Sequence, residues 1–284
     1  MENELKRLKK IAIQIRRDII ETASFGKGGA IHVGPALSSA DIVTALYFKI
    51  MHVDPSNPNW EDRDRFILSK GHAYAVLYSA LAEKGFFPRE ELMTARALNS
   101  RLQGHPVLGK TPGVDMVSGS LGNGLSCGVG IATALKMQCR HARVYVMLGD
   151  GEIQEGMVWE AAMYAGNHGL DNLTAIVDYN HFQSCGAENE IMPLYPLADK
   201  WRAFGWQVME MNGHDMADIV RGLSMAKEFA GRPVCVIAHT VKGKGISFIE
   251  HNNKWHVGRC TMDQHTQAMK ELDEQETAVE AGLM

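Results

Sequence analysis

The sequence predicts an α/β protein with a doubly wound, mainly parallel sheet flanked by helices. From residue 143 onward, apolar runs rich in β-branched residues alternate with stretches of helical periodicity, which is the pattern of this fold class. Strands that are apolar throughout are typical of parallel sheets covered on both faces. Because such sheets bind ligands beyond the carboxyl ends of their strands, we expect a site at that edge. The four runs are RVYVMLGD, NLTAIVDYN, WQVMEMN and PVCVIAHTV.

The first half of the chain adds a strand and several helices. The apolar run DRFILS predicts the strand. Two stretches rich in Gly and Pro, 24–37 and 99–121, match no regular element. Long loops in a compact domain are usually functional, so we expect both stretches to contribute to the site. Apolar spacing and helix breakers predict helices over 4–23, 38–52, 73–84 and 122–140.

Composition excludes several classes of protein. The 284 residues carry a net charge of −4, which leaves no basic surplus for binding nucleic acid or an acidic membrane surface. The 5 cysteines are widely spaced and contain no CxxC pair, so neither a disulfide framework nor a structural zinc site is expected. The basic N-terminal segment lacks a long apolar run, which excludes a signal peptide and a membrane span. We therefore expect a cytoplasmic protein with reduced cysteines.

Domain organisation is expected to be simple. Residues 1–262 are expected to form one domain, followed by an acidic C-terminal tail over 263–284. The tail is only weakly helical in pattern, and we interpret it as a solvated extension or as the beginning of an interdomain linker. No chemistry is assigned to it.

The strongest local signal is Gly149-Asp150-Gly151, which directly follows a predicted strand, with Asn180 at the end of the next one. The thirty positions from Asp150 to Asn180 match one helix plus one strand returning to the same sheet edge. Carboxylate and amide oxygens are hard ligands of the kind that Mg²⁺ or Ca²⁺ prefers. Glycine on both sides of Asp150 allows a bulky anion such as a diphosphate to approach the backbone. The alternative interpretation is a tight turn followed by an ordinary strand end.

This motif and its flanking segments resemble the transketolase family, and they occur in the family's order. The resemblance covers nearly the whole chain, which is identified as similar to the N-terminal, diphosphate-binding half of transketolase. It implies a thiamine-diphosphate-binding fold. The flanking segments are SFGKGGAIHVGPALSSADIVTALYF, DRFILSKGHAYAVLYSALAEKG, LQGHPVLGKTPGVDMVSGSLGNGLS and VKGKGISFIEHNNKWHVG.

The resemblance implies thiamine diphosphate as cofactor, with Mg²⁺ or Ca²⁺ bridging it to the protein. Asp150 and Asn180 are the implied metal ligands, together with the backbone carbonyl of Phe182. The implied cofactor contacts extend along the motif and into two of the flanking segments. They are Gly149, Asp150, Gly151, Asn180, Phe182, Gly119, Ser120, Leu121, His72, Lys242 and His256.

Four histidines, His32, His72, His105 and His256, match active-site positions of the family. Imidazole suits proton transfer to and from sugar hydroxyls near neutral pH. The alternative for each is a surface histidine or a hydrogen-bonded core histidine. Val107 stands where larger members carry an acidic residue, which predicts altered sugar contacts near His105. Around His32 the chain also departs from the family pattern, with Val33 and Pro35 following it.

Other polar residues near these segments are ambiguous. Glu155 and Glu160 match acidic residues that line a path between paired active sites in transketolases, although first-turn charges favoured by the helix dipole would give the same pattern. Glu152 occupies a position where members vary, and no role is assigned to it. His214 matches a family stretch, but it is interpreted as structural, in a turn where Asp215 caps the next helix.

One required group is missing from the sequence. In the family, a glutamate from a separate pyrimidine-binding domain activates the cofactor, and no stretch resembles that domain. The resemblance therefore implies a two-component transketolase whose partner chain supplies this glutamate, with an α2β2 heterotetramer as the natural assembly. It would transfer a two-carbon ketol unit from a ketose or ketose phosphate to an aldose through the cofactor's carbanion.

Two alternatives to this function remain open. One is a non-catalytic or regulatory protein that keeps the fold. The other is a subunit of the deoxyxylulose-phosphate synthase or 2-oxoacid dehydrogenase type, which shares the GDG motif. The segments around His32, His105 and His256 favour transketolase. Pentose phosphates and branched or sulfonated sugars are both open as substrates.

Overall fold

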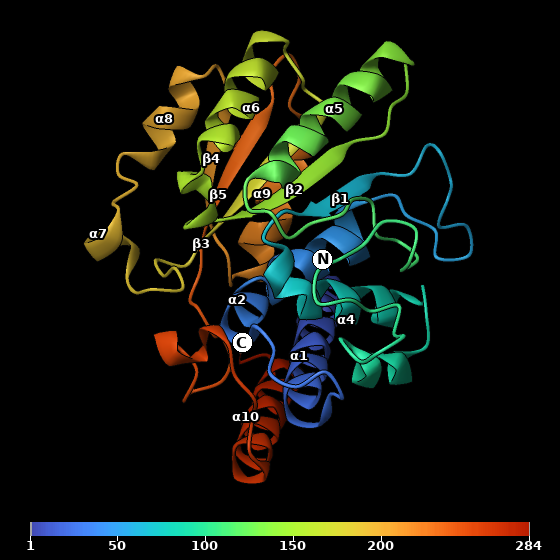
Figure 1. The fold of residues 1–284 in the computed structure, drawn as a ribbon, viewed down its shortest axis with the longest axis vertical. Helices are drawn as coiled ribbons and strands as arrows, with labels where there is room; N and C mark the ends of the chain where they lie inside the picture. Colours follow the sequence, from blue (N-terminus) through green and yellow to red (C-terminus); the bar gives the residue numbers. More distant parts are fainter. Residues whose placement is uncertain (1, 284) are drawn as a thin grey trace.

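A five-stranded parallel sheet forms the centre of the computed structural model, which describes residues 2–283 (Figure 1). The strand order is β1-β2-β3-β5-β4, and each of the four neighbouring pairs is parallel. This confirms the predicted sheet and all five predicted strands. The strands are β1 (Arg65–Leu68), β2 (Val144–Gly149), β3 (Leu173–Tyr179), β4 (Gln207–Asn212) and β5 (Val234–His239).

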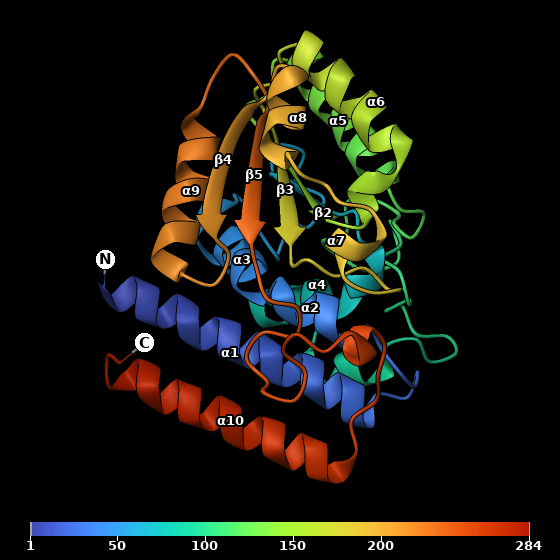
Figure 2. The same ribbon diagram turned by 90° about the vertical axis from the view of Figure 1, so that its left-hand side faces the viewer.

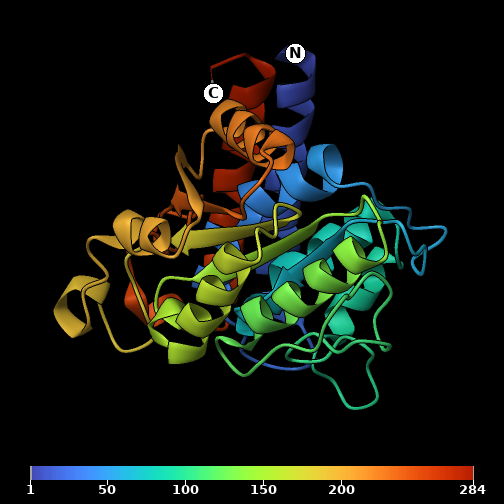
Figure 3. The ribbon, with the colours of Figure 1, turned by 90° about the horizontal axis from the view of Figure 1, so that it is seen from above.

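Helices cover both faces of the sheet, as a doubly wound fold requires. Seen from above, α9 and the pair α5 and α6 lie on opposite sides of the strands (Figure 3). The helices are α1 (Glu2–Phe25), α2 (Val33–Ser38), α3 (Ala40–Ala45), α4 (Tyr74–Lys84), α5 (Asn123–Met137), α6 (Gly156–Asn167), α7 (Glu188–Ile191), α8 (Leu197–Ala203), α9 (Met216–Glu228) and α10 (Met262–Glu280).

The side chains of β2 explain why its sequence is apolar without interruption. Tyr145 and Met147 face a core formed with α1, α3, α4 and α9. Val146 and Leu148 face a second core formed with α5, α6 and α8. All four are fully buried, because alternate residues of a strand point to opposite faces and both faces are covered.

The predicted helix over 38–52 is interrupted, and part of the predicted loop over 24–37 is helical. The chain forms α2, breaks at Ser39, continues as α3 and ends in a π-helical turn, Leu46–Ile50. Ser39 Oγ donates to the Pro35 carbonyl at 3.0 Å and accepts from Lys70 Nζ at 2.5 Å. These two side-chain hydrogen bonds, one to the backbone and one to a buried lysine, compete with the regular backbone hydrogen bonding of a helix at Ser39. The loop prediction was therefore wrong for the residues of α2.

The C-terminal segment over 263–284 is not a solvated tail. Its described residues form most of α10, which lies antiparallel against α1 (Figure 2). Thr261 begins the helix with a capping box, and Leu272 is fully buried in the core under α1. The acidic residues of α10 pair with basic residues of α1, as in Lys10–Glu280 at 2.6 Å and Arg17–Glu276 at 2.8 Å. The acidity that predicted a tail instead complements another helix.

No helix within residues 2–283 combines the length and the apolar character needed to cross a bilayer.

Leu272 tests whether docking of α10 is part of the folded domain. Replacing it with alanine should lower the free energy of unfolding by about 2–5 kcal/mol, because a fully buried leucine loses its contacts and leaves a cavity. Chemical denaturation monitored by circular dichroism measures this change. The control is Met262→Ala at the exposed start of the same helix, which should stay within about 0.5 kcal/mol of wild type. Equal effects of the two substitutions would contradict the packing described here.

Candidate active site

All five parallel strands end at the same edge of the sheet, where the arrows of β3, β4 and β5 point toward α2 and α3 (Figure 2). In the parallel register Gly149 lies opposite Asp178, and Tyr179 lies opposite His239. The segments that follow β1, β2 and β3 therefore meet in space. They enclose a cavity of about 630 Å³. Its position agrees with the expectation for a doubly wound sheet.

The cavity collects most of the residues that the sequence nominated. Ser120 and Lys242 are not part of its wall, and Glu160 lies on the exposed side of α6. The nominated residues in the wall are His32, His72, His105, Gly119, Leu121, Gly149, Asp150, Gly151, Glu155, Asn180, Phe182 and His256.

Asp150 and Asn180 occupy one corner of this cavity. The carboxylate of Asp150 accepts hydrogen bonds from the backbone N–H groups of Gly151 at 2.7 Å and His181 at 2.6 Å. Asn180 Oδ1 accepts from the Phe182 N–H at 3.1 Å. Burial, together with the negative charge of Asp178, raises the pKa of Asp150 to about 7. A cation at this corner would stabilise the ionised carboxylate.

The donors at this corner fit a hard divalent cation. The carboxylate of Asp150 and the amide oxygen of Asn180 belong to the oxygen class that such cations select, as does a backbone carbonyl. Across residues 2–283, no group of three His, Cys, Asp or Glu side chains has the arrangement of a metal site. The predicted ligands at this corner do not form a group of that type, because only Asp150 is one of these four residue types. The other two are the amide oxygen of Asn180 and the backbone carbonyl of Phe182.

Polar atoms without partners also indicate a bound group. His256 Nδ1, Gln183 Nε2 and Ser118 Oγ are buried and lack a hydrogen-bond partner within the described residues. His256 and Gln183 both lie in the cavity wall. Buried polar atoms are nearly always satisfied in native proteins, so a polar ligand here would complete their hydrogen bonding.

Two glycines bring the backbone close to the cavity. A side chain at Gly151 would meet the Cβ of Gln183 at 2.8 Å, so the two loops approach closely only because glycine is present. Gly119 has a φ of +140°, and a Cβ added to it would lie 3.3 Å from the ring of His105. Both positions leave backbone groups accessible where an anion or a flat ring could lie.

Three of the four nominated histidines form a cluster. The ring centroids of His32 and His72 are 5.0 Å apart, and His256 lies 5.3 Å from His32 and 5.5 Å from His72. A backbone bridge between Ile31 and Gly258 brings two distant segments together and so places His32 next to His256. His105 lies at the exposed rim of the same cavity.

Burial sets the protonation state of this cluster. It lowers the pKa of His32 to about 4, that of His256 to about 3 and that of His72 to about 2. Neighbouring positive charges, including Lys70 beside His72 and Lys242 beside His256, lower these pKa values further. The pKa of His105 is also lowered by burial and by Arg96. The clustered imidazoles are therefore neutral at pH 7, so each ring has one N–H that can donate a hydrogen bond and one nitrogen that can accept one.

Two buried lysines border the site, and sequence reasoning found only one of them. Lys242 Nζ donates to Asn253 Oδ1 at 2.6 Å, and burial lowers its pKa to about 8. Lys70 was missed. It lies in the cavity wall, is 1 % exposed and bonds to Asp178. The only signal in the sequence was its position, two residues after β1 and two before His72, which places it at the carboxyl edge of the sheet.

The two acidic residues nominated on the helix after the GDG turn remain exposed in the single chain. Glu155 immediately precedes α6 and lines the cavity, whereas Glu160 lies one turn further along the helix. The burial expected for a proton-sharing pair is thus absent from this chain on its own.

His214 is hydrogen-bonded at both ring nitrogens and has the structural role that the sequence predicted. Its Nδ1 lies 2.8 Å from Asp41 Oδ2, and its Nε2 accepts from the Val241 N–H at 2.8 Å. Because Nε2 accepts a backbone N–H, the proton belongs on Nδ1, facing the carboxylate. The side chain of Asp215 caps α9, as predicted. His214 thereby holds the residue before Lys242 and contributes no atom to the cavity wall.

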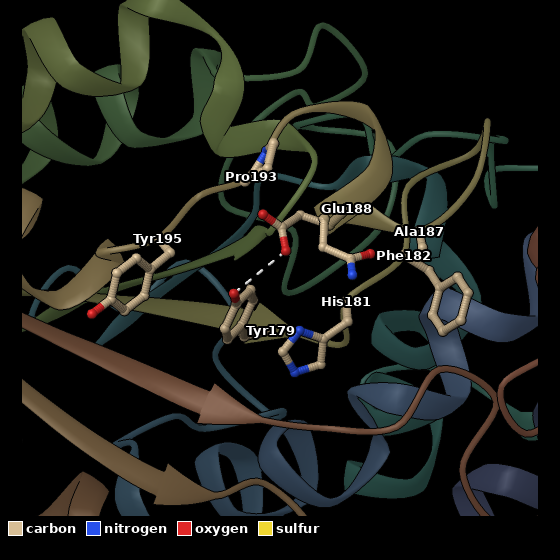
Figure 4. A pocket seen from close by; sticks show the side chains of 8 residues that line it. Tyr179, His181, Phe182, Ala187, Glu188, Pro193 and Tyr195 are labelled. Carbon is tan, nitrogen blue, oxygen red and sulfur yellow. Dashed lines mark hydrogen bonds between the residues drawn. The ribbon is translucent and has the colours of Figure 1, made fainter.

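A second, smaller hollow of about 350 Å³ lies beside the loop that carries Phe182 (Figure 4). Glu188 is buried there and accepts from the Leu194 N–H, while the Tyr179 hydroxyl donates to it at 3.4 Å. The ring of His181 packs on Tyr179 with centroids 4.2 Å apart. These contacts hold the loop in place, and Phe182 is the only nominated residue that lines this hollow.

The neutral histidine cluster predicts a specific pH dependence. The pKa of His72 in the folded chain is about 2, below the 6.5 of a free histidine. Above pH 6.5 the lowered pKa of His72 costs the folded chain no stability. As the pH falls below 6.5, the free energy of unfolding decreases, because His72 binds a proton in the unfolded chain but not in the folded chain. In His72→Asn the free energy of unfolding should fall less between pH 6.5 and 4.5, by up to about 2 kcal/mol. Denaturant titrations across this pH range measure it.

His141→Asn is the control for this experiment, because His141 is exposed and lies outside the cavity. Stability curves of His72→Asn and wild type that run parallel over the whole pH range would contradict the buried neutral state of His72.

Comparison with known proteins identifies the family. The family model for the transketolase thiamine diphosphate binding domain matches residues 8–277. The chain is 46% identical to a 6-deoxy-6-sulfo-D-fructose transketolase subunit of Clostridium sp. (strain MSTE9), over 88% of this chain and 91% of that protein. It is 44% identical to an apulose-4-phosphate transketolase subunit of Phocaeicola vulgatus, over 91% of both chains.

Solved structures agree. The transketolase of Campylobacter jejuni superposes with a TM-score of 0.85 at 29% identity, covering 98% of this chain and 46% of the solved chain. A transketolase of Pichia stipitis gives the same TM-score of 0.85 at 26% identity and covers 44% of that chain. The chain thus spans less than half the length of these solved transketolases. A parallel sheet that gathers a GDG turn, Asn180 and a histidine cluster at one edge, together with these matches, places the chain in the transketolase family as a thiamine diphosphate binding domain.

Proposed function

We propose that the chain is the diphosphate-binding subunit of a two-component transketolase that transfers a two-carbon ketol unit from a ketose donor to an aldose acceptor. The observation that supports this most directly is the single cavity that joins the Asp150–Asn180 corner to three neutral histidines. The named relatives that match almost end to end are transketolase subunits, which supports the same function. Thiamine diphosphate, when bound, supplies the stabilisation of the carbanion.

The cofactor's diphosphate and a divalent cation, Mg²⁺ or Ca²⁺, belong at the Asp150 corner in this proposal. Asp150, Asn180 and the carbonyl of Phe182 would hold the cation, and the backbone at Gly151 would face the diphosphate. Lys242 lies near enough to lend positive charge, since its amino group stands 5.7 Å from the centre of the Phe182 ring. The raised pKa of Asp150 supports this assignment, because a bound cation relieves the cost of a buried carboxylate.

The chain's own residues then position the substrate and move protons. His32, His72 and His256 are neutral, so each offers one N–H donor and one acceptor nitrogen to a sugar hydroxyl, and we assign proton transfer to these contacts. The turn at Gly119 offers backbone groups along the wall on which the cofactor's flat ring would lie. His105 at the rim would contact the end of the sugar that remains outside the cavity.

A partner chain completes the site in this proposal. In the family the glutamate that activates the cofactor's aminopyrimidine belongs to a pyrimidine-binding domain, which no stretch of this chain resembles, so we assign this glutamate to a pyrimidine-binding subunit. An α2β2 assembly follows if a second copy of this chain covers α6. Glu155 and Glu160 would then become buried and could share protons between two sites. We place the enzyme in the cytoplasm, as its dispersed cysteines favour.

The donor sugar is proposed to be a modified ketose or its phosphate. Two of the most similar relatives are named for a sulfonated fructose and for apulose 4-phosphate. Val33, Pro35 and Val107 depart from the pattern of the larger enzymes in the two loops that border the sugar end. A panel containing these donors and pentose phosphates would identify the substrate.

Reconstitution tests the proposed function. The chain alone should be inactive, and adding a pyrimidine-binding subunit with thiamine diphosphate and Mg²⁺ should restore ketol transfer, measured by coupled assays of the released aldose. Release of carbon dioxide from pyruvate without ketol transfer would instead assign the chain to the deoxyxylulose-phosphate synthase or oxoacid dehydrogenase type. Absence of any cofactor-dependent activity with the partner would favour a regulatory protein.

Asp150→Ala tests the metal assignment. Removing the carboxylate should weaken Mg²⁺-dependent binding of thiamine diphosphate by at least about 100-fold, because the ligand carrying the negative charge is lost. Isothermal titration calorimetry on the reconstituted complex measures this. Asp263→Ala, at an exposed aspartate in the first turn of α10, is the matched control and should bind the cofactor as wild type does. Unchanged binding in Asp150→Ala would refute the assignment.

A further inference from the structure

Glu152 follows the GDG turn directly and is almost completely buried, with 3 % of its surface exposed. The resemblance to the family gives it no role. A buried carboxylate in the wall of a cavity that takes a diphosphate is unexpected, because the two negative charges repel each other. The contacts of Glu152 explain why it is there.

Each oxygen of the carboxylate is already occupied by donors from the protein. Glu152 Oε1 accepts from Ser69 Oγ at 2.5 Å and from the Gly122 N–H at 2.9 Å. Oε2 accepts from the Gly149 N–H at 3.0 Å. Although the residue lines the cavity, its carboxylate is therefore held by the chain's own donors, and its charge is distributed over three hydrogen bonds.

The three donors lie on three segments of the chain, one of which, the turn after β2, also carries Glu152, and each segment leads to a predicted cofactor residue. Ser69 directly follows β1 and stands three positions before His72. Gly122 ends the turn that begins at Gly119. Gly149 begins the turn that carries Asp150.

The segments also touch one another at points where no additional atom would fit. A Cβ on Gly71 would stand 2.3 Å from Ser118 Oγ, and a Cβ on Gly124 would stand 2.3 Å from Ser69 Oγ. Small displacements of one segment are therefore transmitted to the next. A single carboxylate that bonds all three segments can fix their mutual spacing.

We propose that Glu152 is a positioning residue that holds these three segments at the spacing required by thiamine diphosphate. It contacts neither the cofactor nor the substrate, and it acts through Ser69, Gly122 and Gly149. This inference rests on the proposed function, because it takes thiamine diphosphate to be the group that the cavity binds.

The proposal explains why a carboxylate is required at position 152. The Gly122 and Gly149 N–H groups are fixed backbone donors, and they bond to different oxygens of the side chain. A glutamine has one oxygen only, so its amide nitrogen would face one of these two donors. An aspartate is one methylene shorter and would not reach all three segments.

Glu152→Gln is the principal test, in the full chain reconstituted with its pyrimidine-binding partner. We expect thiamine diphosphate binding at fixed Mg²⁺, measured by calorimetry, to weaken about 10–100-fold, as for other groups that orient ligand-binding residues. Hydrogen exchange in the cofactor-free chain should increase at Gly122 and Gly149, while far-ultraviolet circular dichroism stays unchanged. Glu228→Gln, at an exposed glutamate of α9, makes the same charge change and should alter neither measurement.

Ser69→Ala provides a second, milder variant that removes only one donor. It should weaken cofactor binding in the same direction, by about 2- to 10-fold. If Glu152→Gln does not fold, this variant decides, and wild-type affinity in Ser69→Ala overturns the proposal. Cofactor affinity of Glu152→Gln within about twofold of wild type overturns it as well, including the case in which only thermal stability falls.

Cofactor binding by the wild-type pair distinguishes failure of the proposed function from failure of the role of Glu152. If the wild-type pair does not bind thiamine diphosphate in the presence of Mg²⁺, the proposed function is wrong, and the positioning role for this cofactor falls with it. If the wild-type pair binds it and Glu152→Gln binds it equally well, only the role of Glu152 is wrong.

Discussion

A buried ion pair between Lys70 and Asp178 lies beneath the whole site, and the arrangement of the surrounding segments depends on it. Asp178 is completely buried, and it also accepts hydrogen bonds from Ser38 Oγ at 2.6 Å and Asn180 Nδ2 at 3.2 Å. Burial alone would raise the pKa of Asp178, but Lys70 holds it below its usual value. Removing one partner of such a pair costs roughly 3–5 kcal/mol, because the other charge is left buried and uncompensated. The pair therefore ties the ends of β1 and β3 to α2.

This interaction has consequences at both ends of the cavity. By holding Nδ2 of Asn180, Asp178 turns the amide oxygen of Asn180 toward the loop of Phe182. Lys70, held in place by Asp178, donates from Nζ to the Pro35 carbonyl at 2.8 Å and to Ser39 Oγ, where the chain breaks between α2 and α3. His32 directly precedes α2, the helix that carries Pro35 and Ser38, so the contacts of these two residues with Lys70 and Asp178 hold the helix next to His32 in place. A charge pair outside the proposed chemistry thus positions residues within it.

The electrostatics of the cavity suit an anionic cofactor and a proton-transfer reaction. The histidines are neutral because burial and nearby lysines disfavour their charged form, and the two lysines supply the positive charge. At the Asp150 corner, a cation would compensate the charge of the buried carboxylate. The unpartnered polar atoms in the wall, His256 Nδ1 and Gln183 Nε2, indicate that a bound polar group completes the site.

Much of the fold, and the meeting of the GDG turn with Asn180 at one sheet edge, could be predicted from the sequence, since both depend on local patterns. Uninterrupted apolar runs determine buried parallel strands, and the carboxyl ends of such strands share an edge. The sequence alone therefore predicts that the GDG turn and Asn180 lie close together. The histidines were nominated through family resemblance, and the sequence alone carried no measure of their mutual distances.

Tertiary structure decided the rest, because the deciding partners are far apart in the chain. The acidic C-terminal segment packs as α10 because its apolar side chains, Leu272 among them, are buried in the core and its acidic residues meet basic residues of α1, and the segment's own sequence does not reveal either partner. The helix breaks at Ser39 because Lys70 is there, thirty-one positions away. Glu152 was an ordinary charge in sequence, and only the fold surrounds it with donors from three segments. Local composition determines which elements form, whereas long-range hydrogen bonds and ion pairs determine how they are held.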